Sequence, residues 1–170
     1  MSRPEHPRVA AISSLLVESG ATGRVLQLTG SARTAAEAAG ELGVPLGAIA
    51  NSLVFDVDGQ PLLVLTSGAH RVDVTKVAGL LGARDVRPAS ADFVRRHTGQ
   101  PIGGVAPIGH PEPIGTLVDV QLARYDRVWA AAGHPHAVFP TSYEELLRLT
   151  GGTAAEVGED PVALPEEVLS

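Results

Sequence analysis

The clearest structural signal in this 170-residue chain is a β-hairpin with its turn at Asp58-Gly59. An Asp-Gly pair suits the positive φ angles of a two-residue hairpin turn. The flanking segments, 48–57 and 60–68, are rich in Val, Leu and Ile, as expected of half-buried strands. The hairpin therefore places an antiparallel pair of strands at the centre of any fold that the chain can adopt.

Helix signals and shorter strand signals surround this hairpin. Thr34 with Glu37 and Ser142 with Glu145 have capping-box spacing, and Asp73 is placed to cap a third helix. Helices are predicted over 7–19, 34–43, 74–82, from Ser90 or Asp92 through His97, and from Ser142; short strands are predicted over 24–28, 116–120, 127–133 and 136–140. Because there is no regular βαβ alternation, we predict a single α+β domain with a mixed, mainly antiparallel sheet flanked by helices.

The composition is that of a globular protein with one domain. The chain has a mass of 17.5 kDa, 44% hydrophobic residues and no cysteine. The lack of cysteine excludes disulfides, thiolate zinc sites and cysteine nucleophiles. The N-terminal segment has no apolar signal core and no apolar run is long enough to span a membrane, so we expect a cytoplasmic protein without a membrane partner.

The net charge of −6 is unevenly distributed along the chain. Residues 153–170 contain five acidic residues and no base, which leaves residues 1–152 with a charge of −1. We therefore divide the chain into a folded domain, 1–152, and an acidic tail, 153–170. The region from His70 to His97 is basic and offers Arg71, Arg95 and Arg96 as candidate tRNA contacts, although such a surface can also be merely solvated. Extended contact with a DNA duplex is not expected.

A long loop, residues 98–115, has an unusual composition. It contains five glycines and four prolines, Glu112 is its only acid, and His110 is its only side chain that titrates near neutrality. Nothing in it resembles a nucleophile or a phosphate-binding loop. If this Gly/Pro loop has a function, it acts through its backbone groups.

Histidines offer an alternative chemistry. His110, His134 and His136 could form a metal site with Asp119. The simpler interpretation is that His110 and His134 orient a loop or a substrate by hydrogen bonding. Because no metal-ligand spacing is present, we predict neither a metal nor a cofactor.

Several segments together resemble the YbaK/EbsC family, stand-alone relatives of the editing insertion domain of prolyl-tRNA synthetase. The resemblance covers residues 34–150, and its most specific part is the pattern from Thr98-Gly99 through Gly103 and Pro107 to Gly109. The segments that carry it are IANSLVF (49–55), LLVLTSGAHRVDVTKVAGLLG (62–82), VRRHTGQPIGGVAPIG (94–109), TLVDVQL (116–122) and VWAAAGHP (128–135).

The resemblance implies a function and a set of site residues. The family hydrolyses mischarged aminoacyl-tRNA, so the expected activity is ester hydrolysis at the 3′-terminal ribose. The expected partner is the acceptor end of that tRNA. Whether the protein forms a homodimer is left as an open alternative. Carried over to this chain, the resemblance assigns catalytic positions to Asn51, Gly103, Gly104 and Pro107. It assigns substrate-binding positions to Ser52, Thr98, Gly109, His110, Asp119 and His134.

One position departs from the family pattern. Many editing members have a lysine in the strand segment where this chain has Asn51. An asparagine amide can donate and accept hydrogen bonds but supplies no positive charge. The sequence is therefore also compatible with a non-catalytic module that binds aminoacyl-tRNA or a nucleotide.

Overall fold

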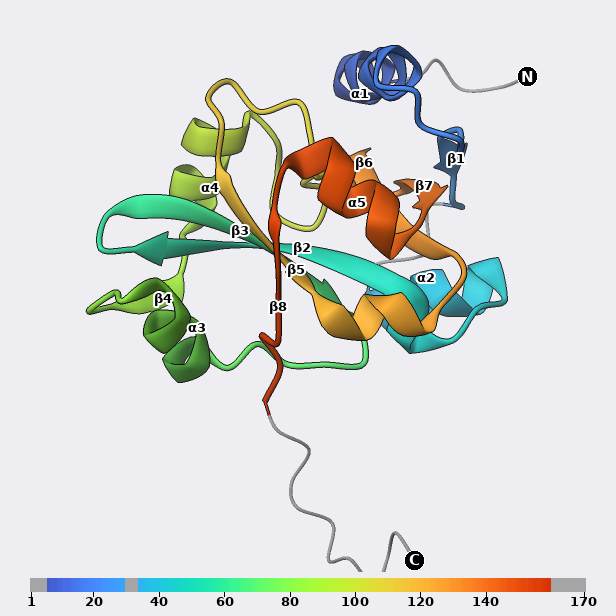
Figure 1. Cartoon of the computed structure of the whole chain (residues 1–170). Coiled ribbons are helices and arrows are strands. Elements are labelled where there is room, and N and C mark those ends of the chain that lie inside the picture. The colour runs from blue at the N-terminus through green and yellow to red at the C-terminus, as the bar shows by residue number, and fades with distance from the viewer. Residues whose placement is uncertain (1–5, 30–33, 160–170) are drawn as a thin grey trace, which may run out of the picture.

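A computed structural model describes residues 6–29 and 34–159 of the chain. In this part of the chain one mixed sheet has the strand order β1-β7-β6-β2-β3-β5-β8, with β4 also paired to β2 (Figure 1). The strands are β1 (Leu26–Gln27), β2 (Ile49–Val57), β3 (Gln60–Ser67), β4 (Val86–Pro88), β5 (Gly115–Asp119), β6 (Val128–His134), β7 (Ala137–Thr141) and β8 (Thr153–Ala155). The helices are α1 (Pro7–Glu18), α2 (Ala35–Leu42), α3 (Val74–Leu81), α4 (Ala91–Thr98) and α5 (Tyr143–Thr150).

The predicted fold class is confirmed. Antiparallel pairing joins β1 to β7, β2 to β3, β2 to β4 and β6 to β7, whereas β2–β6, β3–β5 and β5–β8 are parallel. The longest ladder is the predicted hairpin, which runs from the pair Ala50–Ser67 to the pair Val57–Gln60. Asp58 and Gly59 have φ angles of 50° and 89°, the left-handed conformation that the turn requires.

The edge of β2 that faces away from β3 is only partly covered. β6 pairs with Ile49 and Ala50, and β4 pairs with Phe55 to Val57. Among the described residues, no strand pairs with residues 51–53 on this edge. The sheet therefore has a break between β6 and β4, alongside the middle of β2.

The helix ends follow the predicted capping chemistry. Thr34, Asp73 and Ser142 each accept a hydrogen bond from a backbone N–H in the first turn of α2, α3 and α5. For α4 the two alternatives are resolved: Ser90 is the N-cap, and Asp92 lies within the first turn. These local bonds satisfy backbone donors that the first turn of a helix cannot satisfy itself.

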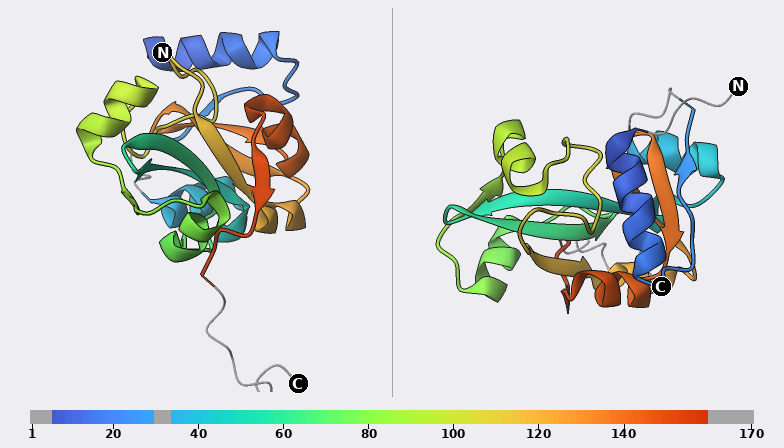
Figure 2. Two further views of the ribbon diagram at one scale, coloured as in Figure 1. Left: turned by 60° about the vertical axis from the view of Figure 1, so that its left-hand side comes forward. Right: turned by 90° about the horizontal axis from the view of Figure 1, so that it is seen from above.

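The hydrophobic core lies on both faces of the sheet. Phe139 of β7, Leu16 of α1 and Leu146 of α5 are fully buried in the larger cluster. Val64 of β3 and Val77 of α3 belong to a second cluster. Figure 2 shows α1 lying across β6, away from α3, so the helices cover different parts of the sheet. The sheet thus provides a rigid frame for the loops at the break.

Some boundaries differ from the sequence-based expectation. Val120 begins a 3₁₀ turn (Val120–Arg124) rather than ending a strand. Thr153–Ala155 pairs with β5 as β8 and Val157 is fully buried, so the first residues assigned to the acidic tail belong to the folded body. Residues 160–170, the rest of that tail, lie outside the described residues.

Membrane insertion by a helix finds no support in the structure. Within the part of the chain that the structure describes, no helix is both long enough and apolar enough to span a bilayer.

Candidate active site at the break in the sheet

A cavity of about 920 Å³ lies at the break beside β2. Its lining comes from β2, the Gly/Pro loop, β6, the β6–β7 turn and α2. The principal lining residues are 49–55, Ile102, Gly103, Val105, Trp129, Ala131 and 134–136. None of the described lining residues is an Asp, Glu, Lys or Arg, so the described wall of the cavity carries no charged side chain other than its histidines.

Asn51 and Ser52 line this cavity from opposite faces of β2. Successive side chains of a strand alternate between faces, so Ser52 shares a face with Ala50 and Val54, which belong to the larger core cluster. Asn51 shares the opposite face with Ile49, whose partner in β6 is Trp129. The two neighbouring residues therefore approach a ligand from different directions.

Two polar atoms at the cavity are buried without a partner. Neither the Ser52 hydroxyl nor the Trp129 indole N–H makes a hydrogen bond to any described residue. Burial of a polar group without a hydrogen bond costs on the order of 1–3 kcal/mol. Such unsatisfied groups, gathered beside one cavity, are typical of a site that a ligand completes.

Gly103 and Gly104 have different positions in the loop. Gly103 lines the cavity and has a φ of 86°, a conformation that disfavours any side chain. Gly104 is buried, and a Cβ built on it would lie 2.8 Å from the His134 carbonyl carbon and 2.9 Å from the Pro135 nitrogen. The Gly104 N–H donates to the Pro101 carbonyl, so this amide is not free to bind a ligand. Gly104 therefore sets the loop against the β6–β7 turn.

The loop is held from inside by a residue that the sequence analysis did not identify. Gln100 is buried; its Oε1 accepts from the Ala106 N–H at 2.6 Å, and its Nε2 donates to the Ile108 carbonyl. Nothing in the local pattern distinguishes Gln100 from a solvated loop glutamine. Only the folded chain shows that one amide spans the loop.

Thr98 and His110 support the same loop and do not line the cavity. The Thr98 hydroxyl donates to the Val94 carbonyl at 2.7 Å and accepts from the Gln100 N–H. His110 Nε2 lies 2.8 Å from the Ala106 carbonyl, and burial lowers the pKa of His110 more than this hydrogen bond raises it. A neutral His110 that donates to Ala106 thus fastens the loop.

His134 lines the cavity as a neutral side chain. Its Nδ1 accepts from the His136 N–H at 3.1 Å, so the proton of the neutral ring lies on Nε2. Burial, followed by the charges of His136, His6 and Arg8, lowers the pKa of His134. The ring therefore offers a ligand an N–H donor and is not arranged as a general base.

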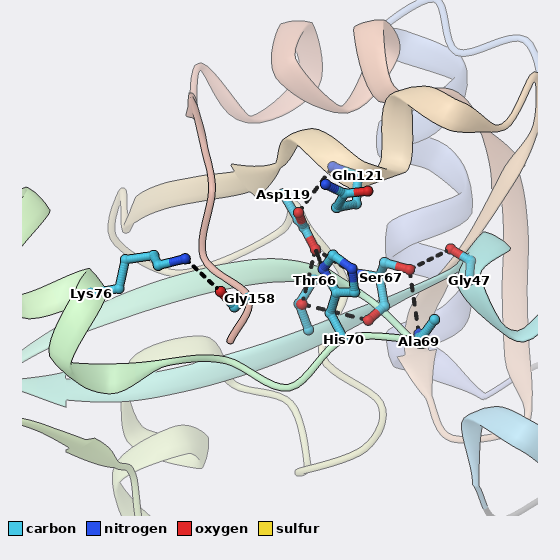
Figure 3. Close-up of polar contacts among 9 residues, drawn as sticks. All are labelled: Gly47, Thr66, Ser67, Ala69, His70, Lys76, Asp119, Gln121 and Gly158. Carbon is cyan, nitrogen blue, oxygen red and sulfur yellow. Dashed lines mark hydrogen bonds and ion pairs between the residues drawn. The ribbon is translucent and has the colours of Figure 1, made fainter. Parts of the chain in front are cut away.

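The structure places Asp119 apart from the cavity. Asp119 is completely buried, and its carboxylate accepts from the Thr66 hydroxyl and from the N–H groups of Ser67 and Gln121, at 3.0–3.2 Å. His70 Nδ1 lies 3.3 Å from the same carboxylate, as Figure 3 shows. Asp119 therefore does not orient groups at the cavity floor as expected, because its oxygens are engaged at the end of β3.

The remaining candidate residues lie around the cavity or on the surface. Pro107 is buried within the loop, and a Cβ on Gly109 would lie 2.5 Å from Ile12 Cδ1, so both serve close packing. Arg71, Arg95 and Arg96 are exposed. Of the predicted site residues, the fold brings Asn51, Ser52, Gly103 and His134 together at the cavity.

The alternative metal site does not assemble. In residues 6–29 and 34–159 there is no group of three or more His, Cys, Asp or Glu side chains that could hold a metal ion. The rings of His134 and His136 lie 5.4 Å apart, but the Nδ1 of His134 is already engaged by the backbone.

Comparison with known proteins identifies the family. The model of the aminoacyl-tRNA editing domain matches residues 29–149. This chain belongs to the aminoacyl-tRNA editing domain family. The predicted resemblance to prolyl-tRNA synthetase editing domains is thereby confirmed, and the cavity lies within the matched residues.

Relatives with this domain occur both as short proteins and within synthetases. The uncharacterized protein YwhH of Bacillus subtilis is 32% identical over 123 residues, which is 72% of this chain and 78% of YwhH. The proline–tRNA ligase of Geobacter sulfurreducens is 29% identical over 132 residues, which is 73% of this chain. The match spans only 23% of that ligase, so the chain corresponds to one part of it.

Solved structures agree with this assignment. A crystal structure described provisionally as a trans-editing enzyme for prolyl tRNA synthetase has a TM-score of 0.87 and 39% identity, over 92% of this chain and 100% of its own. The hypothetical protein APE2540 has a TM-score of 0.80 and 33% identity, over 87% of this chain and 99% of its own.

Proposed function

We propose that this member of the editing family is a deacylase that hydrolyses mischarged aminoacyl-tRNA in trans. Water attacks the ester carbonyl, the bond to the 3′-terminal ribose oxygen breaks, that oxygen takes a proton, and the amino acid leaves as a carboxylate with release of a second proton. The observation that carries the proposal is a cavity whose described lining has no Asp, Glu, Lys or Arg, with the Ser52 hydroxyl and the Trp129 indole N–H buried at its wall without described partners. Editing in trans follows the description of the relative with 39% identity.

The residues at the cavity suit hydrolysis by positioning. His134 supplies a hydrogen-bond donor from Nε2. Asn51 supplies an amide from the face of β2 opposite to that of Ser52. The bare backbone at Gly103 lets a ligand approach closely. Donors fixed before the reaction can stabilise the developing oxyanion without a nucleophilic side chain.

Asn51 also allows a second function. It stands where many members of the family have a lysine, and no described lining residue carries a fixed positive charge that could replace that lysine. A module that binds the aminoacylated end of tRNA without hydrolysing it would also use an uncharged cavity.

Substitutions of Asn51 separate the two functions. In a deacylase that uses the amide, Asn51→Ala should lower turnover roughly ten- to a thousandfold, the range for loss of one positioned donor. Asn51→Lys should also lower turnover, because a longer charged side chain crowds a cavity adapted to asparagine. The measurement is release of amino acid from a panel of charged tRNAs. An inactive parent together with an active Asn51→Lys variant would establish the binding module instead.

A further inference from the structure

The break in the sheet leaves the backbone N–H and C=O of one residue of β2, Ser52, facing the cavity. The Gly68 N–H donates to the Ile49 carbonyl on the β3 side, at 2.7 Å. The Ala89 N–H donates to the Val54 carbonyl on the other side, at 3.1 Å. Because backbone groups alternate in direction along a strand, the N–H and C=O of Ser52 point to the same side as those of Val54. On that side of Ser52 there is no paired strand among the described residues.

Three polar groups of Ser52 are therefore directed to the cavity region. The backbone N–H and C=O point to the open edge, and the hydroxyl is buried without a described partner. An N–H and a C=O spaced in this way are what a sheet edge offers to an added strand. The gap that they face is only three residues long, residues 51–53.

We propose that the aminoacyl group of the substrate pairs with Ser52 as a strand one residue long. Its α-ammonium group donates to the Ser52 carbonyl, and its ester carbonyl accepts from the Ser52 N–H. This inference rests on the proposed function, because it assigns the position of the substrate in the same cavity. Ser52 is then a substrate-positioning residue whose backbone is more important than its side chain.

The pairing also predicts the class of amino acid. Residues directly opposite each other in antiparallel strands project their side chains to the same face. The substrate side chain would therefore lie on the face of Ser52, where the cavity wall is formed by Val94 and Val105, both almost completely buried. Uncharged side chains fit this wall, whereas a carboxylate or an ammonium group would lose hydration without a partner.

Two variants separate the backbone from the hydroxyl. Ser52→Ala removes the hydroxyl and keeps the N–H. Ser52→Pro removes both, and it leaves the ladder with β3 intact because the N–H of residue 52 points away from β3. For a mischarged tRNA that the parent protein deacylates, we expect kcat to be lower in Ser52→Pro than in Ser52→Ala by roughly a hundredfold or more, with a smaller change in KM. Equal kcat in the two folded variants would overturn the inference while leaving the deacylase intact.

A binding measurement does not depend on turnover or on the proline variant folding. The probe is 3′-(L-alanylamino)-3′-deoxyadenosine, in which an amide replaces the hydrolysable ester, and the control is its L-glutamyl counterpart. We expect the alanyl probe to protect the backbone N–H of residue 52 from hydrogen exchange in the parent protein and in Ser52→Ala, and the glutamyl probe to give much weaker protection.

Binding of the alanyl probe with unchanged exchange at Ser52 would overturn the pairing. Equal protection by both probes would overturn the placement of the side chain. A parent that deacylates no tRNA but shows protection by the alanyl probe would retain the pairing and reject only the proposed hydrolysis.

Discussion

The two polar regions at one end of the β2–β3 hairpin differ in how fully their groups are satisfied. At the Asp119 cluster, which consists of Asp119, His70, Thr66, Ser67 and Gln121, one buried carboxylate accepts three hydrogen bonds and faces a histidine. At the cavity, the Ser52 hydroxyl and the Trp129 indole N–H are buried without described partners. In the Asp119 cluster the carboxylate has its hydrogen bonds, and the one buried atom without a described hydrogen-bond partner, His70 Nδ1, lies 3.3 Å from that carboxylate, which indicates a structural role. The region with weakly reactive groups is the one that can receive a ligand.

The strongest test of this contrast removes the carboxylate of the Asp119 cluster. Asp119→Ala leaves the donors of Thr66, Ser67 and Gln121 without an acceptor, so we expect a loss of about 3–5 kcal/mol in the free energy of unfolding. Urea denaturation measures it, with Asp92→Ala, an exposed position, as the control. A variant of unchanged stability that no longer deacylates tRNA would show that the cluster is catalytic and would break the comparison.

A second test acts on the wall of the cavity. Gly104→Val places a branched side chain against the His134–Pro135 backbone and displaces the loop. We therefore expect turnover to fall about a hundredfold, while the melting curve shows that most of the protein still folds. Gly103→Ala is the matched variant: its Cβ meets no atom within 4 Å, and only the φ of 86° opposes it. Activity assays with melting curves compare the two. Parental activity in Gly104→Val would separate the loop from the function.

A third test uses pH to probe the support of the loop. Because the pKa of His110 is lowered in the folded state, the unfolded chain binds a proton more readily. Stability from this group is complete above the unfolded pKa of about 6.5 and is lost as the pH falls below it. His110→Gln can still donate to the Ala106 carbonyl but does not titrate, so its stability should fall less between pH 7.5 and 5.5. The same decrease in both proteins, measured by urea denaturation, would exclude His110 as a contributor.

The smallest expected effect concerns the surface beyond both regions. If Arg95 and Arg96 contact tRNA phosphates, replacing both by Ala should weaken binding and reduce the slope of log K against log salt by about two. The double variant Arg124→Ala with Arg127→Ala removes the same charge from another surface and serves as the control. Identical salt slopes in the parent and both variants would leave α4 without a role in binding.

The elements that the sequence predicted well are those specified by local chemistry. The turn at Asp58-Gly59 and the caps at Thr34, Asp73 and Ser142 each depend on residues within a few positions of one another. The family resemblance then indicated the loop and the strand that border the cavity. Local signals were sufficient to predict the turn and the caps, and motif spacing was sufficient to indicate the loop and the strand.

The parts that could not be predicted depend on contacts between distant segments. The break beside residues 51–53 exists because β6 and β4 each cover only one end of β2, and no pattern in those strands encodes where their pairing stops. Gln100 reaches Ala106 and Ile108 only once the loop has folded. Asp119 is a conspicuous acid in the sequence, yet its hydrogen bonds to the end of β3 exclude it from the cavity.

The short open edge of β2 has a consequence for the behaviour of the protein at high concentration. Exposed strand edges can template edge-to-edge association of chains, which leads to aggregates. Within the described part of the chain, the stretch of this edge without a paired strand is residues 51–53, and it is recessed between β6 and β4 with the Gly/Pro loop and α2 beside it. A continuous strand from another molecule cannot extend past either neighbour, whereas a group about one residue long can enter. The same interruption that leaves room for a small ligand therefore prevents the sheet from growing between molecules at this edge.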